Sequence, residues 1–326
     1  MRPLALAAAL LSSTALAAPQ EVRVGVHLRN VESVDLINDS YHLNFVLWMK
    51  WKGELDPTKT WRFVNLLEAW ALTAQPAFDE PQLLEDGTRY QRFNVEARFF
   101  HKFQLGPYPL DAQQVVLELE DIRHPQSALS YVAEPDSRVE PGLVVPGWIV
   151  EKQLQEVVTA KTSNGSGASP FEASRYRFGV TLQRPARLMI FTMMPPVLLV
   201  LLCCFAVFFL RPQHVDARIG TVITALLAIV FLQLAFTDDL PWLGDSVLLD
   251  QLFNFSYLMM TAALVQCVVV TRWHDLALSL EAEAKAADAK GMREKIRKLD
   301  QLAARLFVPL YLVGCVVLVM VGKEAR

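Results

Sequence analysis

The second half of the chain is dominated by four apolar runs that contain no charged residue, each at least 17 residues long. About 20 apolar residues cross a bilayer as a helix, and an isolated segment spans lipid only as a helix because lipid cannot satisfy free backbone groups. The pattern therefore predicts a four-helix transmembrane bundle over residues 187–326. Its spans are expected at about 188–210, 217–237, 248–271 and 304–322.

The first half shows the two-residue alternation of β-strands. In the stretch YHLNFVLWMKW, the apolar face is expected to consist of Phe45, Leu47, Met49 and Trp51. Short stretches of this kind are separated by turn sequences such as GELDPT, EDGT and HPQS. We find no long amphipathic helix pattern among them. Regularly spaced short strands with such turns predict an all-β, immunoglobulin-like sandwich over residues 18–186.

The N-terminus and the basic residues predict how the chain crosses the membrane. Residues 1–17 combine one arginine, a short apolar run and small residues, which is typical of a secretory signal peptide. The sandwich is therefore expected outside the cytoplasm. Segment 272–303 holds seven lysines and arginines, and basic loops stay on the cytoplasmic side. We expect a multi-pass membrane protein with a solvated, helical cytoplasmic linker at 272–303.

Composition narrows the possible functions. The chain has 326 residues, 53% of them hydrophobic, and a mean hydropathy of +0.27, which favours a membrane protein. All four cysteines lie in apolar runs, so we expect neither a disulfide in the exported half nor a metal site. No GxSxG, HExxH or P-loop motif indicates an enzyme. We expect no catalytic activity, no cofactor and no nucleic-acid partner.

The second apolar run has a polar side. On a helix, seven residues spaced three or four apart form one stripe, with an acid at each end and small, hydroxyl and bulky apolar residues between them. The stripe consists of Asp216, Gly220, Thr224, Leu227, Phe231, Leu234 and Asp238. The opposite side, which suits lipid or other helices, consists of Val222, Leu226, Ile229 and Val230. Several copies around an axis would form a pore, but Gly220 and Thr224 also suit helix packing, and the spacing leaves both interpretations open.

A β-rich exported domain followed by four spans, the second of them polar on one side, resembles the pentameric ligand-gated ion channels of the Cys-loop receptor superfamily. YPLDAQQ resembles a loop motif of the family, DARIGTVITALLAIVFLQ its pore helix, and RLFVPLYLVG the start of its fourth span. Further matching positions are Trp51, Trp148, Arg184 and Pro195–Pro196. The likeness covers nearly the whole mature chain. The cysteines that name the superfamily are absent, as in its prokaryotic branch.

The resemblance implies a homopentamer in the inner membrane of a bacterium, with a pore for monovalent cations lined by the second spans. Asp216 is expected to set the cation preference, while Arg218 points away from the pore, as in the family's cation channels. The three bulky apolar residues of the stripe are expected to form a constriction that excludes water at rest. The alternative is a membrane receptor or sensor that does not conduct.

The resemblance also implies an agonist site between neighbouring sandwiches. One side is expected to contribute Phe78, Ile122, His124, Phe171 and Tyr176, and the other side Trp48. The agonist is expected to be a small molecule or protons. Divalent ions are a further candidate, because the exported domain has 22 acidic and 17 basic residues as well as histidines that titrate near neutral pH.

Coupling between the sandwich and the membrane helices is expected at a charged cluster. Asp39, Asp111 and Arg184 match positions that form such a cluster in the family, and Pro109 and Pro241 match loops that meet there. A buried arginine needs acidic partners, since an unpaired buried charge is costly.

Overall fold

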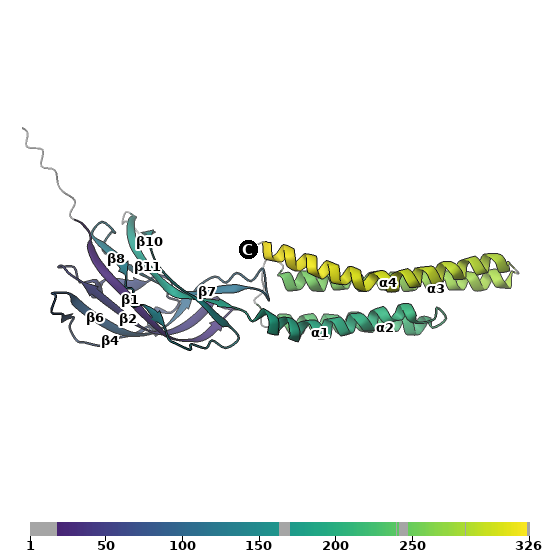
Figure 1. Ribbon diagram of the computed structural model, residues 1–326, viewed down its shortest axis with the longest axis horizontal. Helices are drawn as coiled ribbons and strands as arrows, with labels where there is room; N and C mark the ends of the chain where they lie inside the picture. The colour runs from purple at the N-terminus through teal and green to yellow at the C-terminus, as the bar shows by residue number, and fades with distance from the viewer. Residues whose placement is uncertain (1–17, 163–169, 239, 241–246, 284, 325–326) are drawn as a thin grey trace, which may run out of the picture.

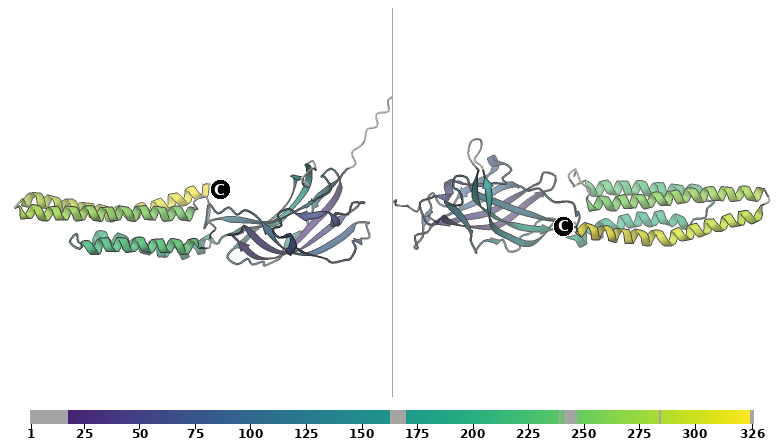
Figure 2. Two further views of the ribbon diagram at one scale, coloured as in Figure 1. Left: turned by 180° about the vertical axis from the view of Figure 1, so that it is seen from behind. Right: turned by 90° about the horizontal axis from the view of Figure 1, so that it is seen from above.

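The computed structural model describes residues 18–162, 170–238, 240, 247–283 and 285–324. A β-rich domain and a helical bundle lie end to end along the longest axis (Figure 1), and two further views show the same arrangement (Figure 2). The predicted signal peptide at residues 1–17 lies outside the described residues. The two expected regions, a sandwich and a four-helix bundle, are both present.

The larger sheet is built around β1, β2 and β6. Its central order is β4-β6-β2-β1-β8, with β5 beside β6 and β9 beside β1. β1 pairs antiparallel with β2 and parallel with β8. The strands are β1 (Gln20–Asp35), β2 (Ser40–Trp51), β4 (Thr73–Pro76), β5 (Gln82–Leu83), β6 (Arg89–Phe100), β8 (Leu129–Ala133) and β9 (Arg138–Val139).

The smaller sheet has the order β10-β11-β7-β3. Its strands are β3 (Trp61–Phe63), β7 (Ala112–Asp121), β10 (Ile149–Thr162) and β11 (Phe171–Gln183). Two single-turn 3-10 helices, Pro57–Lys59 and Ala69–Ala71, lie in the connections. The chain leaves this sheet at the end of β11 and enters the first helix of the bundle three residues later.

The two sheets bury a continuous apolar core between them. Phe45, Leu47, Met49 and Trp51 are each at most 1% exposed, which confirms the alternation predicted for β2. Phe63 on the smaller sheet contacts Phe45 on the larger sheet edge to face, with ring centroids 5.8 Å apart. This aromatic packing fixes the two sheets against each other and gives the helices a rigid attachment point.

The bundle contains four helices that are long and apolar enough to cross a membrane. They are α1 (Ala186–Phe205), α2 (Val215–Thr237), α3 (Leu248–Ala282) and α4 (Ala286–Glu324), and the 3-10 turn Ala206–Phe209 follows α1. α4 ends beside the sandwich, so the sandwich and the end of α4 lie at the same end of the bundle (Figure 1). Four crossings of a membrane require this arrangement.

The expected linker at 272–303 is not a separate helix. It is divided between the end of α3 at Ala282 and the start of α4 at Ala286, and these two helices extend beyond α1 and α2 (Figure 2). Ala277 and Ala289 are fully buried in this extension, and Arg293 donates a hydrogen bond to Glu281 at 2.8 Å. Small buried residues let the two helices approach closely, so the segment folds back on itself instead of running free.

A charged cluster around Glu120 ties together the strands of the smaller sheet. The buried Glu120 carboxylate accepts hydrogen bonds from Arg62 Nη2 on β3 at 2.7 Å, from Thr162 Oγ1 on β10 at 2.9 Å and from Arg175 Nη2 on β11 at 3.0 Å. Burial opposes ionisation of the Glu120 carboxyl, but these hydrogen bonds prevail and lower its pKa below the ordinary value of 4.5. The carboxylate therefore stabilises the folded state as an anion.

We expect Glu120→Gln to lower the free energy of unfolding at pH 7 by about 1–3 kcal/mol, because two arginines lose their shared carboxylate. A folded-state pKa below the unfolded value means that this contribution is present above pH 4.5 and is lost as the pH falls below it. Thermal unfolding of the full chain in detergent should show that the difference in stability between the wild type and Glu120→Gln disappears on acidification. Glu156→Gln, which removes a carboxylate that is 42% exposed, is the control, and an equal loss in both variants would contradict the assignment.

Candidate functional site

One face of α2 is left uncovered by the rest of the chain. All seven residues of the predicted stripe are exposed in the single chain, and the three bulky members, Leu227, Phe231 and Leu234, have exposed fractions of 57%, 62% and 61%. Asp216 begins this face in the first helical turn, and Asp238 follows the last turn. The exposed face therefore runs the length of the helix, with a carboxylate near each end.

The opposite face of α2 packs against α1 and α3. Val222 and Ile229 are fully buried there, and Leu226 is partly buried, as predicted for this side. Val230 is 40% exposed in the single chain, which fits lipid, the other surrounding expected for this side. Val230 directly precedes Phe231 in the chain, so it lies on the border of the exposed face and not in the contact with α1 and α3.

The other polar residues of α2 are hydrogen bonded within the chain. Thr221 Oγ1 donates to the Ala217 carbonyl oxygen one turn earlier at 2.7 Å. Gln233 is oriented toward α3, where its Oε1 accepts a hydrogen bond from Tyr257 Oη at 2.6 Å. Helical spacing already places these residues outside the stripe, and the structure identifies their hydrogen-bond partners.

Arg218 turns away from the exposed face. Its side chain is 1% exposed, and its Nη2 lies 2.6 Å from Asp300 Oδ1 on α4. The expectation that this arginine points away from the stripe is therefore consistent with the packing. The acidic partner on α4 was not anticipated from the sequence.

A second set of interactions joins the sandwich to the helices. The Arg184 side chain, which lies directly before α1, donates from Nε to Asp111 Oδ1 at 2.6 Å. Its guanidinium also lies over the rings of Trp148 and Tyr108, at 4.3 Å and 4.8 Å from their centroids. Asp111 is fully buried and also accepts a hydrogen bond from Gln113 at 2.7 Å. The expected Asp111–Arg184 pair is present, and the two aromatic rings add cation–π contacts that the sequence did not indicate.

Asp39 was expected to join the Asp111–Arg184 pair, but it bonds elsewhere. Its carboxylate accepts a hydrogen bond from Phe103 N at 3.0 Å, and its carbonyl oxygen accepts one from His101 N at 3.0 Å. Asp39 has a positive φ of 48° in the turn between β1 and β2, and this turn places it beside the loop after β6. Asp39 therefore connects two loops of the sandwich.

The loop after β6 also reaches the bundle. The Gly106 carbonyl oxygen accepts a hydrogen bond from Leu248 N at the start of α3, at 2.9 Å. Pro109 is buried in the same loop, while Pro241 lies outside the described residues.

Burial lowers the pKa of His101 in this loop below its ordinary value of 6.5, and the positive charge of Arg177 acts in the same direction. Protonation of His101 therefore opposes the folded arrangement as the pH falls through the acid range.

The structure places the expected ligand-binding residues in different surroundings. Tyr176 is fully buried, and its Oη lies 3.3 Å from Ser137 Oγ. The prediction was wrong for Tyr176, because the alternation of β11 directs this ring into the core. Phe171 and Ile122 are partly buried, and His124 Nδ1 lies 3.0 Å from Asp121 Oδ1. The preceding loop, residues 163–169, lies outside the described residues.

Trp48 and Phe78 both contact residues of the larger sheet. The Trp48 ring covers Gly25 on the neighbouring strand, where an added Cβ would meet the ring at 2.2 Å. Phe78 lies beside Tyr90, with ring centroids 6.1 Å apart. Trp48 is thus part of the larger sheet, Phe78 lies in the connection between β4 and β5, and Phe171 begins β11 of the smaller sheet.

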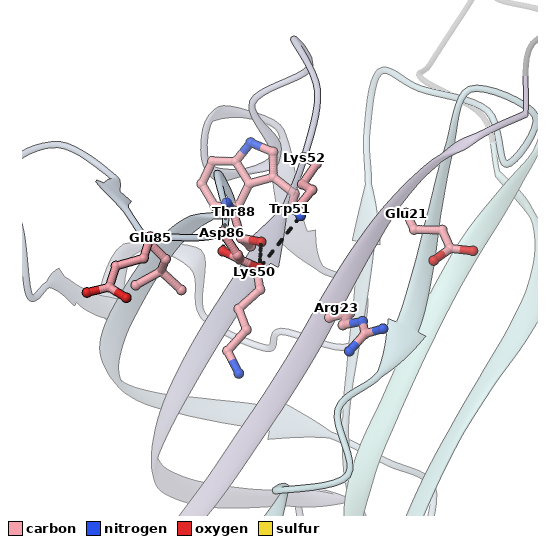
Figure 3. Close-up of a pocket in the computed structure, with 9 residues that line it drawn as sticks. Glu21, Arg23, Lys50, Trp51, Lys52, Glu85, Asp86 and Thr88 are labelled. Carbon is pink, nitrogen blue, oxygen red and sulfur yellow. Dashed lines mark hydrogen bonds and ion pairs between the residues drawn. The ribbon is translucent and has the colours of Figure 1, made fainter.

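A polar cavity of about 760 Å³ lies where β1 and β2 meet the connection from β5 to β6 (Figure 3). Its charged side chains are three acids and three bases, Glu21, Arg23, Lys50, Lys52, Glu85 and Asp86. Lys52 lies 3.6 Å from Asp86, while Lys50 points away from Asp86 and pairs with Glu134 at 2.7 Å. The balance of charge suits a small molecule that carries both signs. Sequence analysis did not predict this cavity, because its lining comes from separated segments.

One cluster among the described residues has donors suited to a divalent cation. His42 lies between two carboxylates, with Nδ1 2.7 Å from Glu32 and Nε2 3.8 Å from Glu96. One ligand atom from each residue can be chosen so that all three lie within 4.8 Å of one another. An imidazole with two carboxylates is a donor set that zinc accepts. The sequence predicted no metal site, since the three residues lie on different strands.

The helical bundle is similar to a known family of membrane proteins. The family model for the neurotransmitter-gated ion-channel transmembrane region matches residues 192–306. The matched segment includes most of α1, all of α2 and α3, and the first part of α4. The match supports a multi-pass ligand-gated ion channel of the Cys-loop superfamily. No curated protein sequence matches the chain.

The exposed face of α2 should be in contact with water. In a chain whose native cysteines are replaced by alanine, we expect Thr224→Cys to react with a charged thiosulfonate reagent after reconstitution. Val222→Cys, on the buried face, and Val316→Cys, on the exposed surface of α4, should react slowly because such a reagent does not enter protein interiors or lipid. Mass spectrometry measures the modified fraction. Equal, slow modification at all three positions would show that the stripe faces lipid or another helix.

Proposed function

We propose that the chain is a subunit of a homopentameric, cation-selective ligand-gated channel in the inner membrane of a bacterium, with its sandwich outside the cytoplasm. The observation that carries the proposal is the uncovered face of α2, with Asp216 at one end and Asp238 at the other. The match over residues 192–306 supports the channel class. Polar groups within a membrane face protein or water, and five such faces around an axis enclose a water-filled path.

The chemistry of this face suits cation conduction. Five Asp216 carboxylates at a narrow mouth create a negative potential that stabilises cations and repels anions, and the low-dielectric wall strengthens both effects. Gly220 and Thr224 follow Asp216 and leave room for hydrated ions. Leu227, Phe231 and Leu234 form an apolar constriction that excludes water when it is narrow. Asp238 enriches cations at the other mouth.

Three kinds of stimulus are supported by described groups in the sandwich. A small molecule would bind between neighbouring sandwiches, at Phe78, Ile122, His124 and Phe171 on one side and Trp48 on the other. A divalent cation fits Glu32, His42 and Glu96. Protons would act on His101, which lies in the loop that contacts α3 and whose pKa is lowered by burial. Each stimulus acts in the sandwich, and the contacts that Arg184 and Gly106 make between the sandwich and the helices, here called the junction, carry its effect to α2.

The junction supplies a physical route from sandwich to pore. Arg184 lies between β11 and α1 and is held by Asp111, Trp148 and Tyr108, while Gly106 contacts the start of α3. Both α1 and α3 pack against α2. A shift of the sandwich loops therefore moves the two helices that flank the pore helix.

A receptor that binds a ligand and signals without conducting is the alternative function. Recording from single pentamers in planar bilayers separates the two, because only a channel gives unitary currents. Native mass spectrometry in mild detergent should give about five times the mass of the mature chain. A stable monomer or dimer, or silent bilayers across pH, divalent-ion and small-molecule screens, would overturn the proposed function.

Selectivity tests the role of Asp216. We expect the wild-type reversal potential in a salt gradient to lie near the cation potential, and Asp216→Ala to shift it toward zero while leaving gating largely intact. Asp238→Ala is the matched control at the wider outer mouth, and it should shift the potential less. A wild-type channel that reverses at the chloride potential would refute cation selectivity.

Gating tests the role of Arg184. We expect Arg184→Ala to assemble and reach the membrane but to respond weakly to stimulus, because Asp111 is left buried without its cation. Removal of one member of a buried charged pair costs about 3–5 kcal/mol. Arg184→Lys retains the charge and should recover part of the response in current recordings. A normal response of Arg184→Ala at normal surface expression would exclude a role in coupling.

A further inference from the structure

A buried charged cluster connects the first turns of α2 to α3 and α4. Arg218 donates two hydrogen bonds to Asp300, from Nη2 to Oδ1 at 2.6 Å and from Nη1 to Oδ2 at 3.2 Å. Gln266 Nε2 on α3 donates to the same Oδ1 at 2.6 Å. Arg218 is 1% exposed, and Asp300 and Gln266 are each 8% exposed. The arginine is held in a bidentate geometry, which fixes its direction as well as its charge.

The cluster lies next to the carboxylate to which we assign selectivity. Asp216 and Arg218 are two residues apart in the first turn of α2, and they lie on opposite faces, the first exposed and the second buried. Each subunit therefore brings one exposed negative charge and one buried positive charge to the same end of the helix. Without compensation, five arginines would oppose the field of five aspartates at the mouth.

We propose that Asp300 is a positioning residue for ion selectivity. It holds the Arg218 guanidinium inside the bundle and neutralises its charge, so that Asp216 alone sets the sign of the potential at the inner mouth. The inference rests on the proposed channel function and assigns a role to a residue on α4, which contributes nothing to the pore stripe itself. Asp300 acts through Arg218 and has no contact with the permeating ion.

The physical argument depends on the cost of an unpaired buried charge. An arginine that loses its carboxylate inside a membrane bundle does not remain there uncompensated. Its flexible stem lets the guanidinium move to the nearest water, and Arg218 lies at the end of α2, next to the inner mouth and the aqueous phase beyond it. The positive charge of Arg218 then adds to the field at the inner mouth, whether the guanidinium lies in the mouth itself or in the aqueous phase beyond it.

The experiment compares reversal potentials of reconstituted pentamers in a sodium chloride gradient. We expect Asp300→Asn to lower the sodium-to-chloride permeability ratio by about tenfold or more, because focused mouth charges change local ion concentrations by at least this factor. Arg218→Gln/Asp300→Asn removes both charges and should restore the wild-type ratio. Glu294→Gln, on the exposed surface of the same helix and paired with Lys298, removes the same charge and should leave the ratio unchanged.

The outcomes separate the inference from the proposed function. A cation-selective wild type with an unchanged ratio in assembled Asp300→Asn pentamers would refute the role of Asp300. If Asp300→Asn alone does not assemble, mixed pentamers with wild-type chains provide the test, and the ratio should fall as the variant fraction rises. A ratio independent of that fraction refutes the inference. A wild type that does not conduct, or that prefers chloride, overturns the proposed function instead.

Discussion

Lipid offers no hydrogen-bond partners, and this constraint divides the surface of α2 into two faces. Groups that face the bundle can bond only to other helices, and two residues of α2 find partners there: Arg218 pairs with Asp300, and Gln233 contacts Tyr257 and Asp250. Asp216, Thr224 and Asp238 lie on a face that no other helix of the same chain covers. That face needs water or a second subunit, and both needs are met when copies of the chain surround a water-filled axis.

The sandwich is attached to the bundle through specific contacts of Arg184 and Gly106. Arg184 stands where the chain passes from β11 into α1, and its charge is compensated by Asp111 and by two aromatic rings. Gly106 provides a second contact, with the start of α3. The aromatic core joins the two sheets of the sandwich, and in the proposed channel this lets motion of the sandwich pass to the two helices that flank α2. Under the proposed function, coupling and pore geometry would depend on one set of packed elements.

The extension formed by α3 and α4 has a further role in this arrangement. It places Asp300 opposite the first turn of α2, at a sequence separation of 82 residues from Arg218. A solvated, independent linker would not hold a carboxylate at this position. The buried alanines that bring the two helices together therefore also support the position of Asp300 beside Arg218.

Local pattern determined the strands, the spans and the stripe on α2, because periodicity of two or three to four residues depends only on neighbouring positions. The alternation of β2 and the exposure of all seven stripe residues follow from such spacing. Spacing did not reveal that Asp39 binds Phe103 in place of Arg184, or that the Arg184 guanidinium lies over Trp148 and Tyr108. Those outcomes, like the Arg218–Asp300 pair and the Glu32–His42–Glu96 cluster, depend on which distant elements pack together. Long polar side chains take the partners that packing brings within reach, so only the tertiary structure decides them.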